Sequence, residues 1–560
     1  MMTTFPPGLI LVLGAFAVPF LNPGVRKALL LALPLAVLVL IWGVPDGPVL
    51  TVRYLDYELV MLQGTRLGRL FATIFAIMTF VGSLFAFNQR RVFELAAAQL
   101  YAGSAICVAM AGDLITVFVF WELMAVGSTV VVWSARTTTA YRASLRYMMV
   151  HFFGGVVLMV GIVAHVADTG SIAFVAMQPE TLGTWLILIG FLINAGAPPL
   201  SAWLPDAYPE ASWSGAVFLS AFTTKTAVYV LIVGFPGAEI LIWVGVYMIF
   251  YGIIYALLEN DMRRILAYSI INQVGFMVCG IGIGTELAIN GAASHAFAHI
   301  IYKALLLMSA GSVLYSTGKR KCTDLGGLFQ SMPLTTVCGI IGALAISSFP
   351  MTSGFISKSM ISSAAADQHM AFVWFMLTAA SAGVFLHAGI KFPWFVFFQK
   401  DSGLRPPDPP WNMRAAMVIF AGLCIGLGVW PEPLYAILPF PVDYVPYTAG
   451  HVIQMLQLLL FAGLAFFLLL PFMKRTLTLS LDFDWLYRRL LPLVVQLFLA
   501  TFGPVDRAVR TIFVGSVKNV IARVFRYAGP NGPWARTAQA GSMVYWAVSL
   551  LVVYLVLYMA

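Results

Sequence analysis

Long uninterrupted apolar runs recur from one end of this sequence to the other, and they limit the fold more than any other feature. About fifteen such runs, each of roughly 20 residues, can be marked along the chain. In lipid every backbone N–H and C=O group must be satisfied within the protein, so only helices and closed barrels span a bilayer. The runs are continuous rather than alternating. The sequence therefore predicts an all-α polytopic membrane protein with about 14–16 transmembrane helices.

The charged residues agree with this class of protein. Only 10% of the 560 residues are charged, against roughly 25% in a soluble domain. The net charge of +9 comes from Lys and Arg in short connections, as in the predicted loop 134–146 and at Lys319-Arg320-Lys321. These connections are expected on the cytoplasmic side, and the loop 168–183 on the external side. We expect the bilayer of a bacterial inner membrane as the surroundings and no nucleic-acid partner.

The sequence lacks the common motifs for metal, nucleotide and redox-cofactor sites. The five cysteines are scattered without a CxxC pair, and the sequence has no GxGxxG, Walker or HExxH motif. We therefore expect no cofactor and no metal in this chain, so redox or ATP chemistry would belong to other chains. The N-terminus lacks a positively charged leader region, and we interpret it as a first membrane helix.

A ladder of ionisable groups is predicted on the buried helix over residues 292–311. His295, His299 and Lys303 recur at four-residue intervals, which places them on one helix face. Four residues advance a helix by about 6 Å, so the ladder is about 12 Å long. Charge within a bilayer is expensive, and three such groups in register favour a path for protons or small cations. The alternative is that the two histidines only hydrogen-bond between helices.

Other ionisable side chains inside predicted spans complete the candidate path: Glu122, Lys225, Lys358 and Lys391. Glu122 could instead form a structural hydrogen bond to a neighbouring helix. Lys391 either lines the exit of the path or snorkels to the membrane interface. Arg146 and His151 have either a structural role or a role at the entry of the path.

Two predicted helices are interrupted. Pro198-Pro199 breaks the first, because each proline removes a backbone donor. A Pro/Gly interruption at 348–354 breaks the second, beside Lys358. Interrupted helices at membrane depth are typical of transporter ion sites. Their corresponding positions suggest inverted repeats over about residues 94–234 and 241–398.

The predicted organisation has five parts. They are N-terminal membrane helices (1–90), a proton-translocating core (91–400), further membrane helices (401–475), an amphipathic lateral segment (476–540) and a C-terminal membrane helix (541–560). The lateral segment is expected because arginines alternate with Val, Ile and Phe at helical spacing between Pro504 and Ala528. Near residues 48–68 the sequence VLTVRYLDYELVML suggests a short external hairpin.

Four motifs resemble those of the antiporter-like membrane subunits. They are WLPDA at 203–207, LAYS at 266–269, HAFAHIIYKALLLMSAGSV at 295–313 and SGFISK at 353–358. This superfamily includes the large subunits of Mrp-type multisubunit cation/proton antiporters, to which the motifs are most similar, and the proton-pumping subunits of respiratory complex I. The resemblance covers about residues 90–400. It implies two inverted five-helix repeats, each with one broken helix, and other membrane subunits as partners.

The resemblance also implies roles for particular residues. Glu122 matches the buried glutamate of the family, and Lys303 with its histidines matches the central relay. One position departs: the family usually carries a lysine before the first break, where this chain has Asn194. Our hypothesis is that Lys225 replaces that lysine as counter-ion to Glu122. The alternative is that this half of the chain has lost pumping.

Three functions are compatible with these patterns. The chain is a subunit of a Na⁺/H⁺ antiporter, a proton-pumping subunit of a complex I-like NADH:quinone oxidoreductase driven by other chains, or a structural subunit. Buried charges argue against the third function, since they are costly in a purely structural protein. The motifs favour the antiporter, with H⁺ and Na⁺ as the transported ions.

Overall fold

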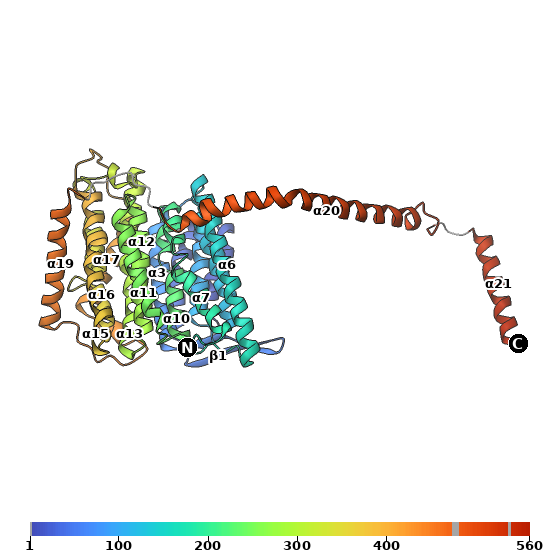
Figure 1. Cartoon of the computed structure of the whole chain (residues 1–560), viewed down its shortest axis with the longest axis horizontal. Coiled ribbons are helices and arrows are strands. Elements are labelled where there is room, and N and C mark those ends of the chain that lie inside the picture. Colours follow the sequence, from blue (N-terminus) through green and yellow to red (C-terminus); the bar gives the residue numbers. More distant parts are fainter. Residues whose placement is uncertain (1–2, 473–480, 536–538, 560) are drawn as a thin grey trace. The chain divides into compact units, whose positions relative to one another are not determined.

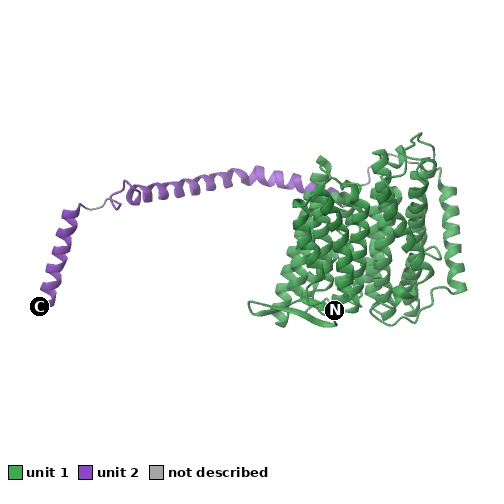
Figure 2. Ribbon diagram, turned by 180° about the vertical axis from the view of Figure 1, so that it is seen from behind, with its two compact units in different colours: residues 1–484 green, residues 485–560 purple. Residues whose placement is uncertain are grey.

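A computed structural model describes residues 3–472, 481–535 and 539–559. The chain forms two compact units, residues 1–484 and residues 485–560, drawn in green and purple in Figure 2. Both units are helical. In the first unit a two-stranded antiparallel hairpin is the one sheet among the described residues.

The first unit is a bundle of helices (Figure 1). Its N-terminal part contains α1 (Pro7–Ala17), α2 (Pro23–Ile41), β1 (Gly47–Tyr54), β2 (Tyr57–Gly64) and α3 (Arg66–Phe85). The next part contains α4 (Val92–Ala109), α5 (Leu114–Trp133), α6 (Thr138–Thr169), α7 (Leu182–Ala195), α8 (Trp203–Ala207), η3 (Tyr208–Glu210), α9 (Gly215–Leu219) and α10 (Thr223–Gly234). The predicted hairpin is confirmed, with Tyr54 paired to Tyr57 at its turn.

The rest of the first unit begins with α11 (Ile240–Leu258), α12 (Met262–Ile283), α13 (Glu286–Thr317), α14 (Pro333–Ile346) and α15 (Ser353–Asp367). It continues with α16 (Ala371–Val384), the π-helical segments η6 (Phe385–Lys391) and η7 (Trp394–Phe398), α17 (Trp411–Val429), α18 (Glu432–Tyr435) and α19 (Ala449–Leu469).

Fourteen helices of the described residues are long and apolar enough to cross a membrane. The prediction of an all-α polytopic membrane protein is therefore confirmed. The predicted loop 134–146 was partly wrong, because α6 begins at Thr138 and carries Arg142 and Arg146 in its first turns. The Thr137 side chain caps this helix by accepting a hydrogen bond from the Ala140 backbone, and that cap fixes the early start.

The second unit contains η8 (Leu486–Leu490), α20 (Leu491–Ala528) and α21 (Ala540–Met559). A helix is present within the segment predicted to be amphipathic, and α20 runs through Pro504 without ending; the lateral, amphipathic role of the segment stays a prediction. The predicted start of this segment at Thr476, and Arg536 within it, lie outside the described residues. The predicted final helix corresponds to α21.

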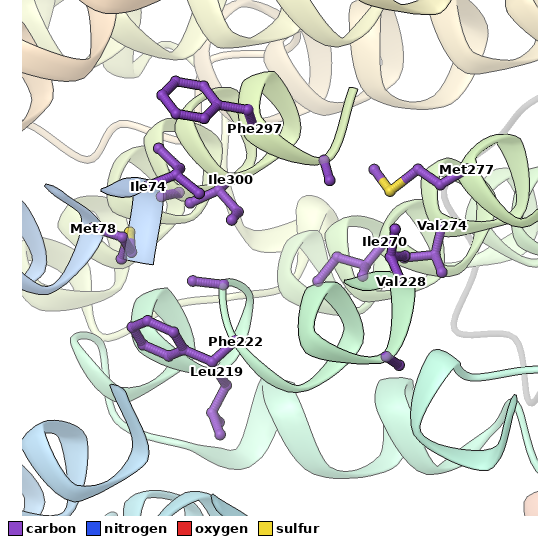
Figure 3. Close-up of a cluster of buried hydrophobic side chains, with 14 of the residues drawn as sticks. Ile74, Met78, Leu219, Phe222, Val228, Ile270, Val274, Met277, Phe297 and Ile300 are labelled. Atoms are coloured by element: carbon purple, nitrogen blue, oxygen red, sulfur yellow. The ribbon is translucent and has the colours of Figure 1, made fainter. Parts of the chain in front are cut away.

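The centre of the first unit lies where α12 and α13 cross it, because the apolar windows of these helices are 100% and 94% buried. Figure 3 shows the hydrophobic cluster that packs them against α3 and α10. The labelled side chains are Ile74, Met78, Leu219, Phe222, Val228, Ile270, Val274, Met277, Phe297 and Ile300. All five cysteines are buried.

The two predicted repeats share several features of local structure. Their longest helices, α6 and α13, each contain 32 residues, each begin after a threonine cap and each end at a glycine in the left-handed conformation. Each repeat also contains an interrupted helix. In the first, α7 ends at Ala195 before Pro198-Pro199; in the second, α14 ends at Ile346 before α15 begins. These parallels agree with the predicted repeats, whose inverted relation stays a prediction.

Candidate functional site

The predicted ladder on α13 is fully buried. His295 Nδ1 lies 3.0 Å from Ser357 Oγ on α15, and its Nε2 lies 3.2 Å from Gln273 Oε1 on α12. The Tyr302 hydroxyl donates to the same Gln273 oxygen over 3.1 Å. This polar network joins α12, α13 and α15, so the ladder faces helices of the core and not lipid.

His299 and Lys303 continue the ladder along α13. The rings of His295 and His299 have centroids 6.3 Å apart, and neither ring nitrogen of His299 has a hydrogen-bond partner in the described part of the chain. Lys303 Nζ donates to Ser269 Oγ over 2.8 Å and to the Leu266 carbonyl over 3.4 Å. Two ionisable rings and an amine therefore follow one another at the centre of the unit.

Lys225 and Lys358 each donate a hydrogen bond to a carbonyl at the end of the helix that precedes their own. Lys225, in the first turn of α10, donates to the carbonyl of Ser220, the residue that ends α9, over 2.5 Å, and to Thr224 Oγ1 over 3.1 Å. Lys358 on α15 donates to the Ile346 carbonyl at the end of α14 over 3.1 Å. The last carbonyls of a helix have no partner within it and carry partial negative charge. A lysine at such a position is therefore stabilised without a carboxylate.

Lys391 ends a different helix in the same manner. It is 6% exposed. Its ammonium donates to the carbonyls of Ala256, Leu257 and Glu259 at the end of α11, over 3.1, 2.5 and 2.6 Å. Whether Lys391 lines the exit of the path or reaches the membrane interface stays a prediction. Its neighbour on the π-helical segment, His387, donates from Nδ1 to the Gly383 carbonyl over 2.8 Å.

No ion pair joins any of these four lysines to a carboxylate among residues 3–472, 481–535 and 539–559. This corrects the hypothesis that Lys225 is the counter-ion of Glu122. Glu122 is half-buried on α5, its Oε1 is buried without a hydrogen-bond partner, and its carboxylate rests against Gly155 of α6. A Cβ at Gly155 would lie 1.9 Å from that oxygen, so only glycine leaves room for the carboxylate.

Asn194, on α7, contacts α6 at His151, one helical turn before Gly155, against which this carboxylate rests. Its Oδ1 is 2.8 Å from His151 Nδ1, and His151 and Gly155 are four residues apart on one face of α6. The tyrosine and tryptophan rings of Tyr147 and Trp203 pack on the His151 ring at 4.1 and 4.6 Å. The first break thus places a neutral amide where the resemblance leads one to expect a lysine. His151 has a structural contact to it.

Charged residues at the end of the unit near Lys319 hold the two repeats together. Arg320 donates to Glu210 over 2.9 Å and forms an ion pair with Asp261 over 2.8 Å. The fully buried Arg263 donates to the carbonyls of Pro209, Ala211 and Ser212. Arg146 forms a two-point ion pair with Asp206 of α8, which favours the structural role for Arg146.

Sequence reasoning missed several members of the network. Gln273, Ser357 and Tyr302 were not among the candidate residues, although Tyr302 lies within the motif at 295–313 and Ser357 within the motif at 353–358. Glu94 is fully buried at the start of α4, where it accepts hydrogen bonds from Ser212 and Ser214 over 2.6 Å each. Its place directly after Arg90-Arg91 looked like a membrane boundary and gave no signal of burial.

The described residues contain no group of three His, Cys, Asp or Glu side chains placed to hold a metal ion. A small cavity of about 100 Å³ lies beside Lys358, between α15, α16 and α19. Its polar lining residues are Lys358, Ser359, Ser362, Ser363, Thr378, Ser381, His451 and Gln454. The arrangement offers proton-exchanging groups and hydroxyls.

Comparison with known proteins defines the class of this chain. The family described as "NADH:quinone oxidoreductase/Mrp antiporter, TM" matches residues 111–384, which include every candidate site residue except Lys391. Residues 111–384 are therefore similar to the membrane region of this family of antiporter-like subunits.

Particular relatives sharpen this picture. The chain is 32% identical over 269 residues to a Na(+)/H(+) antiporter subunit of Alkalihalophilus pseudofirmus, covering 44% of this chain and 54% of that protein. Four curated relatives are spanned over 40–59% of their own lengths. A chain of the Mrp complex from Dietzia sp. DQ12-45-1b has the same fold, with a TM-score of 0.68, 20% identity and coverage of 78% of this chain and 95% of that one.

A second solved structure matches over nearly the whole length. A chain of the membrane-bound sulfane sulfur reductase, an archaeal respiratory membrane complex, gives a TM-score of 0.71 and 25% identity. The match covers 98% of this chain and 99% of the other. It therefore extends into the residues of α20 and α21. Both solved neighbours are chains of complexes.

Proposed function

We propose that this chain conducts protons within a multisubunit monovalent cation/proton antiporter of a bacterial inner membrane, with Na⁺ as the exchanged ion. The path runs through Lys225, the histidines of α13, Lys303 and Lys358, and Lys391 stands at its end. One observation carries the proposal. Each of these lysines is buried and is held by carbonyl or hydroxyl oxygens, with no carboxylate in the described residues.

The energetic argument concerns the charged state of a buried lysine. An ammonium without a carboxylate partner is costly in a low-dielectric interior, so the charged and neutral amines come closer in free energy than in water. Two unit charges about 10 Å apart interact by about 1.7 kcal/mol at an effective dielectric constant of about 20. A proton arriving at one lysine therefore affects the occupancy of the next.

Contacts along the path support transfer between the groups. Lys225 stands at the start of α10, and this helix packs directly against α13, which carries both histidines. Ser357 connects His295 to the helix that carries Lys358. From Lys358 the polar cavity leads toward His451 at the start of α19. Glu122 has no hydrogen bond or ion pair with these groups among the described residues, so we place it outside the path, in the first predicted repeat.

A second candidate function rests on one specific observation. The near-complete match to the respiratory complex chain, including the residues of α20 and α21, favours a proton-pumping role in which redox chemistry on other chains supplies the energy. The site would do the same work in both functions, since both require protons to cross through the same buried groups. The difference lies in the energy source.

The test uses the whole complex, purified and reconstituted in proteoliposomes with a pH-sensitive dye inside. For the antiporter, an imposed Na⁺ gradient moves protons in the opposite direction without any electron donor. Lys303→Ala abolishes this movement, and the matched control Lys319→Ala, at an exposed loop lysine, does not. Proton movement that requires an electron donor and ignores Na⁺ would replace the antiporter with the second function. Full transport by Lys303→Ala would overturn both.

A further inference from the structure

Helix α19 is only loosely packed on the rest of the first unit. It stands at one edge of the bundle (Figure 1), and its buried side chains are Leu459, Ala462 and Phe466. A groove of about 650 Å³ separates it from α14, η6 and η7. Its lining is apolar or aromatic throughout, and Phe385, Trp394, Leu460 and Phe467 are among its members. Ligand sites commonly measure about 300–1,000 Å³, so the groove has the volume of a ligand site.

A polar pocket continues the groove at one end. This pocket measures about 840 Å³ and shares Phe467 with the groove, and Phe395 and Gln399 in its wall follow Trp394 and Phe398 directly in sequence. Its polar side chains are Thr323, Asp324, Gln399, Lys400, Asp401 and Ser402. It lies next to Lys319-Arg320-Lys321, on the side predicted to be cytoplasmic. An apolar groove that opens into a charged pocket at the membrane surface matches the two ends of a phospholipid.

Trp394, which lines the groove, and Gln399, which lines the pocket, each carry a buried polar atom without a partner in the described residues. The indole Nε1 of Trp394 and the amide Oε1 of Gln399 are both buried and have no hydrogen-bond partner in the described part of the chain. Buried polar groups are nearly always hydrogen-bonded. The Trp394 N–H requires an acceptor such as an ester carbonyl, and the Gln399 oxygen requires a donor such as an ammonium or a hydroxyl.

The charged side chains in the pocket limit which lipid headgroup can bind there. Asp401 is already paired, because Arg405 donates to both of its carboxylate oxygens. One cation, Lys400, and one further anion, Asp324, then remain in the lining. Such a pair complements a zwitterion that carries a phosphate and a primary ammonium.

We propose that the groove and the pocket form one binding site for an aminophospholipid of the phosphatidylethanolamine type. The acyl chains lie between α19 and η6–η7, the ester carbonyl accepts from Trp394, and the headgroup lies between Lys400 and Asp324. The lipid fills the gap beside α19 and packs on η6, the segment that carries His387 and Lys391. The inference does not depend on which ion the complex transports.

The test measures lipid bound to the complex purified in mild detergent, by native mass spectrometry. About one phosphatidylethanolamine per chain is expected in the wild type. A Cβ at Gly463 would lie 3.5 Å from Phe385, at ordinary contact distance, so Gly463→Phe puts a ring into the groove without a backbone clash. This variant should lose the lipid at least about tenfold. The matched control, Leu468→Phe, changes an exposed position on α19 that does not line the groove.

Two further measurements separate the headgroup from the chains. In nanodiscs of phosphatidylethanolamine and phosphatidylcholine, Lys400→Glu should remove the preference for the first lipid, and Lys319→Glu should keep it. A phosphatidylethanolamine with a photoreactive acyl chain should label peptides of residues 385–398 and 456–467. Equal lipid retention by Gly463→Phe, or labelling of another subunit's helix from a cysteine at position 463, would overturn the proposal.

Discussion

The two interrupted helices close their free ends with different chemistry. At the first break, the Ile193 carbonyl near the end of α7 accepts from the indole N–H of Trp203 over 2.9 Å. At the second, the Ile346 carbonyl at the end of α14 accepts from the ammonium of Lys358 over 3.1 Å. The structural need is the same in both, because the last carbonyls of a helix have no partner within it. One break meets it with a neutral donor and the other with a charged one.

The comparison of the two breaks distinguishes what the fold requires from what the function requires. Since Trp203 closes a break without any charge, a charge is not needed to build one. The cost of burying Lys358 therefore has to be explained by something other than the fold, and proton exchange explains it. In the first repeat the corresponding charge is displaced from the break to Lys225, which closes the end of α9 instead.

The largest expected effect comes from the charged break. Lys358→Ala should reduce proton movement in proteoliposomes to background, because the amine that exchanges the proton is gone. Lys358→Arg is the sharper variant, since arginine keeps the charge and a donor but does not release its proton. It should fail as completely while the complex assembles normally on a native gel. Activity in Lys358→Arg would mean that the position acts only through its charge.

A lysine introduced at position 194, beside the neutral break, should couple energetically to Glu122 during transport. Asn194 contacts α6 at His151, one helical turn before Gly155, against which the Glu122 carboxylate rests. We expect transport to become sensitive to Glu122→Gln by several-fold in this background, and less so in the wild type. A double-mutant cycle on transport rate measures the coupling. Identical effects of Glu122→Gln in both backgrounds would contradict the geometry.

A smaller effect on stability is expected at the donor of the first break. Trp203→Phe keeps the ring and removes the N–H, which leaves the Ile193 carbonyl with only the Gly196 N–H at 3.1 Å, at a cost of about 1 kcal/mol. Thermal unfolding of the purified complex measures this loss. Transport at permissive temperature should change by less than about twofold, in contrast to Lys358→Ala, because the tryptophan carries no proton. Trp121→Phe, at a buried indole without a hydrogen-bond partner in the described residues, is the matched control.

The smallest expected effect concerns the ion pair between Arg320 and Glu210, which joins the two predicted repeats outside the spans. Burial alone would raise the pKa of the Glu210 carboxyl, but Arg320 outweighs burial and holds this pKa below its ordinary value. A lowered pKa means that the pair stabilises the fold above the pKa of the unfolded chain, about 4.3. That contribution is lost as the pH falls through the lower, folded value.

Arg320→Gln should therefore cost about 1 kcal/mol at neutral pH, a modest value because the pair is partly exposed. The melting temperatures of the variant and the wild type should converge as the pH falls below about 4. Differential scanning fluorimetry across pH measures both. A difference that stays constant down to strongly acidic pH would contradict the assignment of the effect to Glu210.

Much of the fold could be predicted because each signal was local. Apolar runs gave the spans, Pro198-Pro199 gave the first break, and four-residue spacing placed His295, His299 and Lys303 on one buried face. The partners of these groups could not be predicted in the same way. Gln273 and Ser357 contact His295 from helices that are distant in sequence, and nothing in their own neighbourhoods distinguishes them from residues that bridge helices.

The error over Glu122 has a physical reason too. Sequence spacing places the glutamate and Lys225 in separate helices and says nothing about which way each side chain turns. Gly155 opens a space on α6 that receives the carboxylate, while the carbonyl of Ser220 attracts the ammonium of Lys225 elsewhere. Both preferences depend on backbone groups that become available only once the helices have packed.

The burial of all five cysteines has a practical consequence for every experiment above. Cys107, Cys279, Cys322, Cys338 and Cys424 are shielded from water-soluble maleimides in the folded chain. A thiol introduced at a chosen surface position would consequently be the reactive one, so spectroscopic probes can be attached one by one to the native background without first removing the natural sulfhydryls.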